Sequence, residues 1–289
     1  MNVLITGASS GFGTLIVNDL VSAGHRVVGS MRDINGRNAG AAAEFKAMGV
    51  EVVEIDVTDE ASVTSGVAAA TRALGSIDAL INNAGIGAHG LQENFSADDF
   101  RRLFDINVFG VQRMIRAVLP DMRERGSGII LNISSLLGRV ALPFYGPYNA
   151  SKWALEAMSE NYRAELSGFG VDVALVEPGG FPTRFINNLM PPTSRDRDAG
   201  YGDMAGAPQA TLDGFEDFLA ATPEQNPQLV ADAVITVLST TAGERPFRTE
   251  VDRIGMAEPL KSYNDHLAQV TAGLFANLGM EDMLTLKTA

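Results

Sequence analysis

The N-terminal residues read as a strand, a glycine-rich loop and a helix in direct succession, which commits the chain to an α/β arrangement. Residues 2–6 are mostly apolar, glycines stand at positions 7, 11 and 13, and residues 12–23 repeat apolar side chains at the helical period. A loop of this kind directs backbone N–H groups and the positive end of a helix at a phosphate. The glycine spacing differs from the common G-x-G-x-x-G pattern, so two interpretations stay open: a nucleotide-binding loop, or a tight turn that needs glycine for its backbone angles.

Strand and helix patterns then alternate along the chain, which is typical of a parallel sheet covered on both faces. Strands are predicted near 2–6, 26–31, 51–55, 77–81, 128–133, 171–176 and 247–251. Helices are predicted near 12–23, 38–48, 60–74, 97–124, 147–167 and 228–240, with Ser96 as the cap of the fourth. No Pro/Ser-rich linker or repeat divides the 289 residues. We therefore expect one Rossmann-like, doubly wound domain of about seven strands, with a helical extension at 259–289.

Composition excludes several classes of protein. With 22 basic and 35 acidic residues, the net charge of −13 argues against nucleic acid or an anionic membrane as a partner. The chain has no cysteine, no visible secretory signal and no apolar run of the roughly eighteen residues that span a bilayer. We expect a cytoplasmic protein without a metal site, in which 46% hydrophobic residues supply a sizeable core.

A tyrosine and a lysine four residues apart, Tyr148 and Lys152, project from the same face of a predicted helix. A lysine beside a phenol lowers the pKa of the phenol, and bringing it from about 10 toward neutrality takes about 4 kcal/mol. A hydroxyl such as that of Ser135 could then hold a substrate oxygen. Tyr145 lacks such a partner, because Asn149 stands four residues after it. Such a pair also occurs by chance on solvated helix faces, so it indicates chemistry only together with other motifs.

Six separated motifs in order resemble the short-chain dehydrogenase/reductase family, of the common short-subunit type, over about residues 1–185. They are the glycine loop, Asn82-Asn83-Ala84-Gly85, Asn107, Asn132-Ile133-Ser134-Ser135, Tyr148-x-x-x-Lys152 and Pro178-Gly179. The segment 29–33 and the extended C-terminus are most similar to the hydroxysteroid and retinol dehydrogenase branch.

The resemblance implies hydride transfer between a nicotinamide cofactor and a ketone or aldehyde, with an alcohol as the reduced product. In reduction Tyr148 is the general acid, Ser135 holds the carbonyl oxygen, and Lys152 lowers the pKa of Tyr148 and binds the nicotinamide ribose. Asn107 is expected to hold a water that links the lysine to solvent; the alternative is a helix kink or a satisfied structural amide. Ser134 is expected to hydrogen-bond locally.

The resemblance also implies the cofactor contacts, and the second predicted strand indicates NADP(H) over NAD(H). Met31 occupies the usual acidic position, and Arg32 beyond it can pair with a 2′-phosphate. Asp33 is the complication, because it favours NAD if its side chain turns inward. The expected contacts are Gly7, Ser9, Ser10, Gly11, Phe12, Gly13, Arg32, Asp56, Val57, Asn83, Ala84, Gly85, Tyr148, Lys152, Pro178, Gly179 and Thr183. For Asp56 a turn or helix cap is the alternative.

The substrate pocket is expected to be apolar and fairly large. Two regions should build it, with the side chains Leu137, Val140, Leu142, Phe144 and Tyr145, and Phe181, Phe185, Ile186, Leu189 and Met190. Residues 190–225, rich in Gly, Pro, Asp and Ala, predict a mobile lid that is poorly ordered without ligand. We expect a homodimer or homotetramer through helices 97–124 and 147–167, unless the tail obstructs it.

Two rival classes share this fold. A catalytically silent dinucleotide-binding sensor or scaffold is the main alternative, although such relatives usually lose the tyrosine or the lysine. Lyase or dehalogenase relatives lose the glycines of the first loop, whereas Gly7, Gly11 and Gly13 are intact here.

Overall fold

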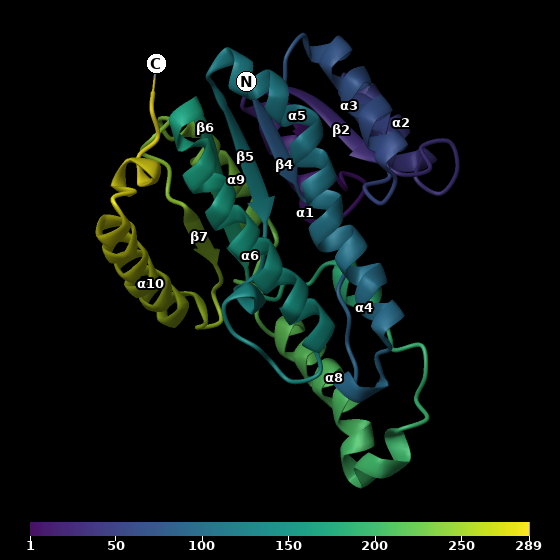
Figure 1. The fold of residues 1–289 in the computed structure, drawn as a ribbon. Helices are drawn as coiled ribbons and strands as arrows, with labels where there is room; N and C mark the ends of the chain where they lie inside the picture. Colours follow the sequence, from purple (N-terminus) through teal and green to yellow (C-terminus); the bar gives the residue numbers. More distant parts are fainter. Residues whose placement is uncertain (289) are drawn as a thin grey trace.

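A computed structural model describes residues 1–288, which form one sheet of seven parallel strands in the order β3-β2-β1-β4-β5-β6-β7 (Figure 1). The strands are β1 Asn2–Ile5, β2 Arg26–Met31, β3 Glu51–Glu54, β4 Ala79–Asn82, β5 Gly128–Ile133, β6 Val171–Pro178 and β7 Arg248–Val251. The strand order reverses between β1 and β4, so a crevice opens at their carboxyl ends. The doubly wound α/β fold is confirmed.

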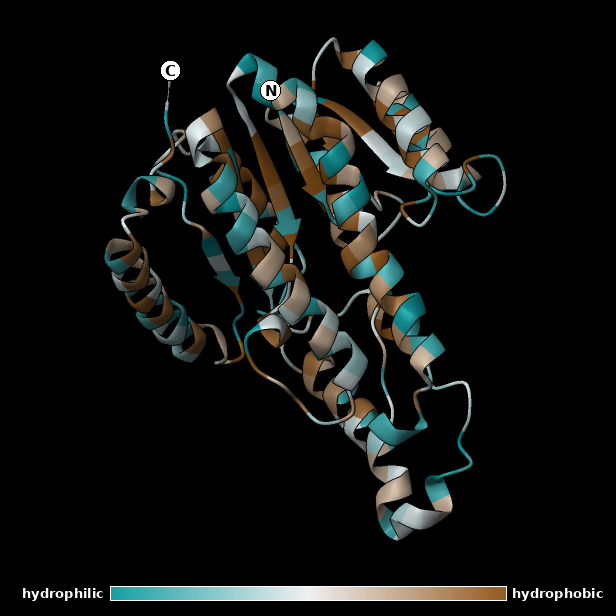
Figure 2. Ribbon diagram, viewed as in Figure 1, coloured by the Kyte–Doolittle hydropathy of each residue, from teal (hydrophilic) through white to brown (hydrophobic). Residues whose placement is uncertain are grey.

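Helices cover both faces of the sheet, and each face has its own apolar core. Helices α1, α2 and α9 pack on one face, and α3, α5 and α6 on the other. Neighbouring residues of one strand serve opposite faces, because side chains alternate along a strand: Val3 and Ile5 join the first core and Leu4 the second. Figure 2 shows mostly hydrophobic residues along the central strands β4 and β5, whereas the edge strand β7 is mostly hydrophilic. The helices are α1 Phe12–Ser22, α2 Ala39–Ala47, α3 Glu60–Leu74, α4 Ala97–Phe104, α5 Val111–Arg125, α6 Gly146–Leu166, α7 Arg184–Asn187, α8 Ala207–Ala220, α9 Gln228–Ser239 and α10 Ala257–Leu278.

The helix predicted at 97–124 is interrupted. It begins with a capping box, in which Ser96 and Asp99 bond to each other's backbone N–H groups, so the predicted cap is confirmed. A π-helical turn, Asp105–Gly110, then separates α4 from α5 and contains Asn107. Periodicity could not show this turn, because the apolar stripe continues through it.

The segment predicted as a lid contains helical structure. Residues 198–206 form 3₁₀ turns, and α8 follows them. The approach to α8 is fastened to the body: Thr193 Oγ1 donates to the buried Asp99 carboxylate at 2.9 Å, and Asn94 Nδ2 donates to Asp198 at 2.6 Å. These partners lie about a hundred residues away in sequence, so composition could not indicate them.

The C-terminal tail is helical, as predicted, and α10 lies along the β7 side of the molecule (Figure 1). Within Ala257–Leu278 only Asn264 is buried, whereas Tyr263, Val270, Leu274 and Leu278 are exposed. Among residues 1–288 no helix is both long and apolar enough to cross a membrane.

Candidate active site

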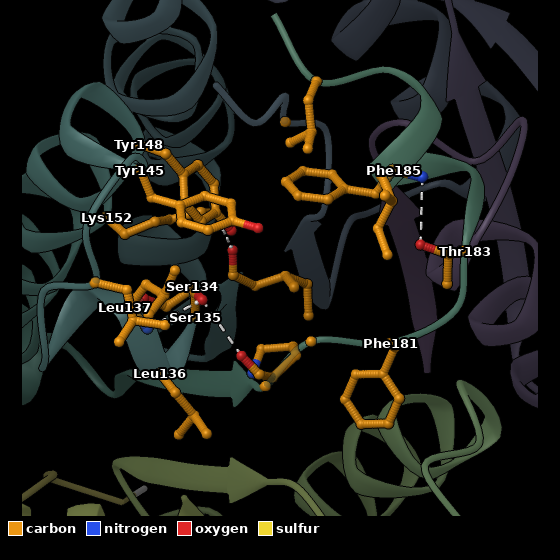
Figure 3. Close-up of a pocket in the computed structure, with 18 of the residues that line it drawn as sticks. Ser134, Ser135, Leu136, Leu137, Tyr145, Tyr148, Lys152, Phe181, Thr183 and Phe185 are labelled. Atoms are coloured by element: carbon orange, nitrogen blue, oxygen red, sulfur yellow. Dashed lines mark hydrogen bonds between the residues drawn. The ribbon is translucent and has the colours of Figure 1, made fainter. Parts of the chain in front are cut away.

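The predicted catalytic side chains meet at the carboxyl ends of the strands. Ser135 follows β5, Tyr148 and Lys152 lie in the first turns of α6, and Pro178 ends β6. Together they line a cavity of about 220 Å³. Figure 3 shows the serine, the tyrosine and the lysine on one wall, with Phe185 and other apolar side chains opposite.

Ser135 is the serine that faces the tyrosine. Its hydroxyl accepts from the Leu137 N–H at 3.1 Å and donates to the Pro178 carbonyl at 3.3 Å, and beside Tyr148 it acts to lower the pKa of that phenol. The expectation that Ser134 bonds locally is wrong: its buried hydroxyl has no hydrogen-bond partner within the described residues. The reason is register, because Ser135 caps the 3₁₀ turn Leu136–Gly138 and takes the local N–H itself.

The pKa of Tyr148 is raised, not lowered as the sequence predicted. Burial raises it to about 12 and the neighbouring Tyr145 adds to the rise, while the hydrogen bond with Ser135 opposes it. The ammonium of Lys152 is directed elsewhere: it donates to the Ile133 carbonyl at 2.8 Å and lies 5.7 Å from the centroid of the Tyr148 ring. Burial lowers the pKa of Lys152 to about 8, against the charge of Glu156. Tyr148 is therefore a protonated phenol at neutral pH, ready to donate.

The Asn107 side chain is fully engaged. Its Nδ2 donates to the Ile86 carbonyl at 2.9 Å and to Ser151 Oγ at 3.1 Å, and its Oδ1 accepts from the Ile86 N–H at 3.0 Å. A Cβ on Gly85 would lie 3.3 Å from this Oδ1 and 4.0 Å from Lys152 Nζ, so Gly85 lies beside both side chains. The structure thus contains the satisfied amide of the alternative interpretation.

Two of the loop glycines serve close packing. A Cβ on Gly13 would come within 2.3 Å of the Gly7 carbonyl oxygen, and one on Gly7 within 2.8 Å of Ala84 Cα. Asn83 joins the same two segments, because its Nδ2 donates to the Thr6 and Gly7 carbonyls, both at 3.0 Å. The predicted motifs around residues 7–13 and 83–85 are therefore brought together.

Gly11, at the start of α1, has a different environment. Its φ is +57°, and the nearest atom to an added Cβ would be Thr183 Cβ at 3.8 Å. In the described chain no side chain caps α1, and its first turn holds no acidic residue. The first N–H groups of α1 therefore have no side-chain cap, and the glycines of the loop precede them. Free N–H groups at a helix N-terminus bind phosphate groups, so this loop fits the diphosphate of a dinucleotide. Thr183 itself caps α7, accepting from the Phe185 N–H at 3.3 Å.

The end of β2 carries a basic side chain toward the same crevice. Arg32 Nη1 lies 3.7 Å from the Asp56 carboxylate, which also accepts from the N–H and hydroxyl of Thr58. Burial acts to raise the pKa of Asp56, but the Thr58 bonds and the Arg32 charge outweigh it and lower the pKa. Asp33, at φ +50°, turns its carboxylate onto the Arg37 N–H at 2.8 Å, within its own loop.

Apolar side chains make up most of the cavity. Leu137, Leu142, Tyr145, Phe181, Phe185, Ile186 and Leu189 line it as predicted, whereas Val140, Phe144 and Met190 do not. Sequence reasoning missed Thr211 and Phe215 of α8, and Ile254 and Met256 after β7. Phe215 packs so closely over Gly180 that an added Cβ there would lie 2.3 Å from its ring. No motif in the sequence could have identified these residues, because they lie outside the two regions expected to build the pocket.

A buried charge cluster lies behind the catalytic wall and was also missed. Arg248 Nε lies 2.9 Å from the Glu156 carboxylate and 3.1 Å from that of Glu177, and its Nη2 contacts Glu160. Asn264 of α10 donates to Glu177 at 2.9 Å. Burial, with the neighbouring charge of Glu156, raises the pKa of Glu177 to about 8. Two features of the sequence could have indicated this charge cluster. Glu156 stands four residues after Lys152, and Glu177 stands directly before Pro178-Gly179.

Within residues 1–288 no group of three or more acidic or histidine side chains is arranged to hold a metal ion.

Known proteins with a similar sequence are oxidoreductases by name. The chain matches the family model described as short chain dehydrogenase over residues 1–193. It is 35% identical to retinol dehydrogenase 8 of Homo sapiens over 83% of this chain and 78% of that protein. It is 40% identical to 3-ketodihydrosphingosine reductase of Bacteroides thetaiotaomicron, over 86% and 87%. It is 34% identical to human 17-beta-hydroxysteroid dehydrogenase type 1, over 82% and 73%.

Solved structures agree with these relatives. A short-chain dehydrogenase from Streptomyces avermitilis superposes with a TM-score of 0.75 at 30% identity, covering 96% of this chain and 97% of that one. A short chain dehydrogenase/reductase from Burkholderia phymatum in complex with NAD gives 0.73 at 28%, covering 94% of each chain. Actinorhodin polyketide ketoreductase with NADPH gives 0.71 at 28%, over 86% and 95%. Relatives with either dinucleotide therefore share this fold. The chain belongs to the short-chain dehydrogenase/reductase family of oxidoreductases, in its hydroxysteroid and retinol dehydrogenase-like branch.

Proposed function

We propose that this protein interconverts a ketone or aldehyde and an alcohol with NADP(H), with Tyr148 as general acid in reduction and general base in oxidation. One observation carries the proposal. Ser135, Tyr148 and Lys152 converge in an otherwise apolar cavity, beside a glycine loop that leads into an uncapped helix. Relatives named for retinol, a hydroxysteroid and 3-ketodihydrosphingosine act, by those names, on alcohols or ketones, which supports the same chemistry here.

The protein's part is to hold the carbonyl and supply a proton. The reduced nicotinamide, when bound, supplies the hydride to the carbonyl carbon. The Ser135 hydroxyl, already polarised by the Leu137 N–H, would turn from the Pro178 carbonyl to donate to the substrate oxygen. As negative charge develops on that oxygen, Tyr148 gives up its proton to it, and the raised pKa keeps that proton in place until then.

Lys152 has two proposed roles. Its ammonium would offset the charge left on Tyr148, and it would bind the ribose hydroxyls of the cofactor. Asn107 and Lys152 both lie beside Gly85, and we expect the Asn107 turn to complete a path for protons between Lys152 and solvent.

The proposed preference for NADP(H) rests on Arg32 and Asp33. Arg32 is half exposed at the end of β2, where a 2′-phosphate would lie, and Asp33 is engaged in its own loop. We expect Arg32→Ala to weaken NADPH binding by about tenfold or more and NADH binding little, because only NADPH carries the phosphate. Titration of both cofactors by fluorescence checks this; equal losses for the two would refute the assignment.

Three further features belong to this proposal. The substrate is bulky and apolar, which the cavity walls support. Residues 190–225 act as the lid of a single domain, and α8 already contributes Thr211 and Phe215 to the cavity. The protein assembles as a homodimer or homotetramer through α4–α5 and α6, where Phe109 and Trp153 are 49% and 42% exposed. Sedimentation of native protein and of Trp153→Ser tests the assembly.

The decisive experiment follows NADPH consumption with ketones and aldehydes, from small diketones to steroids. We expect the native protein to turn over bulky apolar carbonyls, and Tyr148→Phe to bind NADPH without turnover. If the native protein binds NADPH tightly but reduces none of these compounds, the reductase proposal fails and the catalytically silent sensor takes its place.

A further inference from the structure

Two residues that line the cavity, Ser134 and Tyr145, carry hydroxyls without a hydrogen-bond partner among residues 1–288, and the proposed reaction uses neither. The hydroxyl-bearing residues of the cavity are Ser134, Ser135, Tyr145, Tyr148, Thr183 and Thr211. Ser135 and Tyr148 face the reacting oxygen, Thr183 caps α7, and Thr211 donates to the Ala207 carbonyl at 2.7 Å. The Ser134 hydroxyl is fully enclosed by protein atoms. The Tyr145 hydroxyl differs from all of these, because it is not fully enclosed, no residue in 1–288 hydrogen-bonds to it, and its ring lines the cavity.

The Tyr145 ring is held in place from behind. His89, which is 8% exposed, contacts it edge-on with 4.6 Å between ring centroids and an interplanar angle of 64°. Tyr145 also sits at the N-terminal boundary of α6, three residues before Tyr148, so both phenols rise from one helix end. Figure 3 shows the two rings on the same wall of the cavity, facing Phe185.

The environment of Tyr145 keeps its hydroxyl protonated. Burial and the carboxylate of Glu216, on α8, raise the pKa of Tyr145. At neutral pH it can therefore donate one hydrogen bond and accept others. A plain ketone would cover this hydroxyl with hydrocarbon and leave it without a partner, which disfavours binding.

We propose that Tyr145 is a specificity-determining residue, whose hydroxyl binds a hydroxyl group on the carbon next to the reacting carbonyl carbon. The substrate class is then an apolar ketone that carries an adjacent hydroxyl. The inference rests on the proposed reduction at this site. It assigns the second polar contact of the substrate, because Ser135 and Tyr148 both address the carbonyl oxygen and the facing side chains Phe181 and Phe185 are apolar.

The test uses pairs of ketones that differ by one group. In each pair one compound has a hydroxymethyl beside the carbonyl and the other an ethyl, as in α-hydroxyacetophenone and propiophenone, and further pairs carry long alkyl chains. The measurement is kcat/KM with NADPH for native protein and Tyr145→Phe. Tyr263→Phe is the matched control, because that phenol is exposed on α10, outside the cavity.

We expect Tyr145→Phe to lower kcat/KM for the hydroxyl compound of a pair by about tenfold and to leave the ethyl compound within about twofold. Tyr263→Phe should change neither. Equal effects of Tyr145→Phe on both compounds, or no effect on either, would overturn the assignment while the reductase proposal stands. If native protein reduces no compound of any pair, the reduction itself is refuted, and the assignment with it.

Discussion

Replacing Glu177 by glutamine should stabilise the protein in alkaline solution and not in acid. Glu177 is 0% exposed, and its pKa rises from 4.5 to about 8 through burial and the nearby Glu156 carboxylate. The native state therefore keeps a proton that the unfolded chain releases. A pKa raised by folding adds stability that is fully present below pH 4.5 and is lost as the pH rises through 8.

The raised pKa sets the size of this effect. The pKa differs by about 3.5 pH units between the two states, which corresponds to at most about 5 kcal/mol of unfolding free energy between acid and alkaline solution. Sharing of the Arg248 guanidinium with Glu156 reduces that figure, so we expect about 2 kcal/mol. Glutamine resembles the protonated acid in shape and is uncharged, so it removes the titration of this side chain.

The assay is urea unfolding of native protein and Glu177→Gln at pH 5 and pH 9. We compare the free energy of unfolding of the variant with that of the native protein. We expect this difference to favour the variant by about 2 kcal/mol more at pH 9 than at pH 5. Glu160→Gln is the control, because Glu160 contacts the same arginine from a partly exposed position. A stability difference between variant and native protein that is equal at pH 5 and pH 9 would falsify the assignment of the bound proton to Glu177.

Three other outcomes follow from the site. The charge of Glu156 raises the pKa of Lys152, so Glu156→Gln should lower the pKa of Lys152 by about one unit below its value near 8. NMR titration of the lysine ¹³Cε signals measures this pKa, and an unchanged value contradicts the electrostatic role of Glu156. Gly13→Ala should unfold or displace the first loop, because the added Cβ would lie 2.3 Å from the Gly7 carbonyl oxygen. A loss of stability below about 1 kcal/mol in thermal unfolding would show that the loop can move to accommodate the methyl group. Phe215→Ala should raise KM for bulky apolar ketones about tenfold with little change in kcat, and unaltered steady-state kinetics would place α8 outside the substrate contacts.

The sheet, its flanking helices and the catalytic side chains follow from local patterns. Alternating runs of buried residues and glycine punctuation are properties of short segments, so they locate β1, the first loop and α1 without any tertiary information. Ser135 follows from the family resemblance, because the family's serine stands thirteen residues before its tyrosine, and the structure places Ser135 beside the phenol.

Features that depend on distant partners could not be predicted. The π-helical turn is stabilised by bonds from Asn107 to Ile86 and Ser151, which are far apart in sequence. The sign of the Tyr148 pKa change was wrong because burial, a tertiary property, outweighs the nearby lysine. The Glu177–Arg248 contact joins two strands of the sheet, and no spacing rule connects them.

Because of how α10 is attached, opening this helix should cost less free energy than opening the sheet. Asn264 is its buried side chain, bonded to Arg139, Glu177 and Glu250, while most of the helix faces solvent. Detaching α10 would therefore expose little of the apolar core and cost far less than opening the sheet. Amide hydrogens of α10 should exchange with deuterium by local opening, well before those of β4 and β5. A single asparagine thus determines how often the wall behind the active site is uncovered.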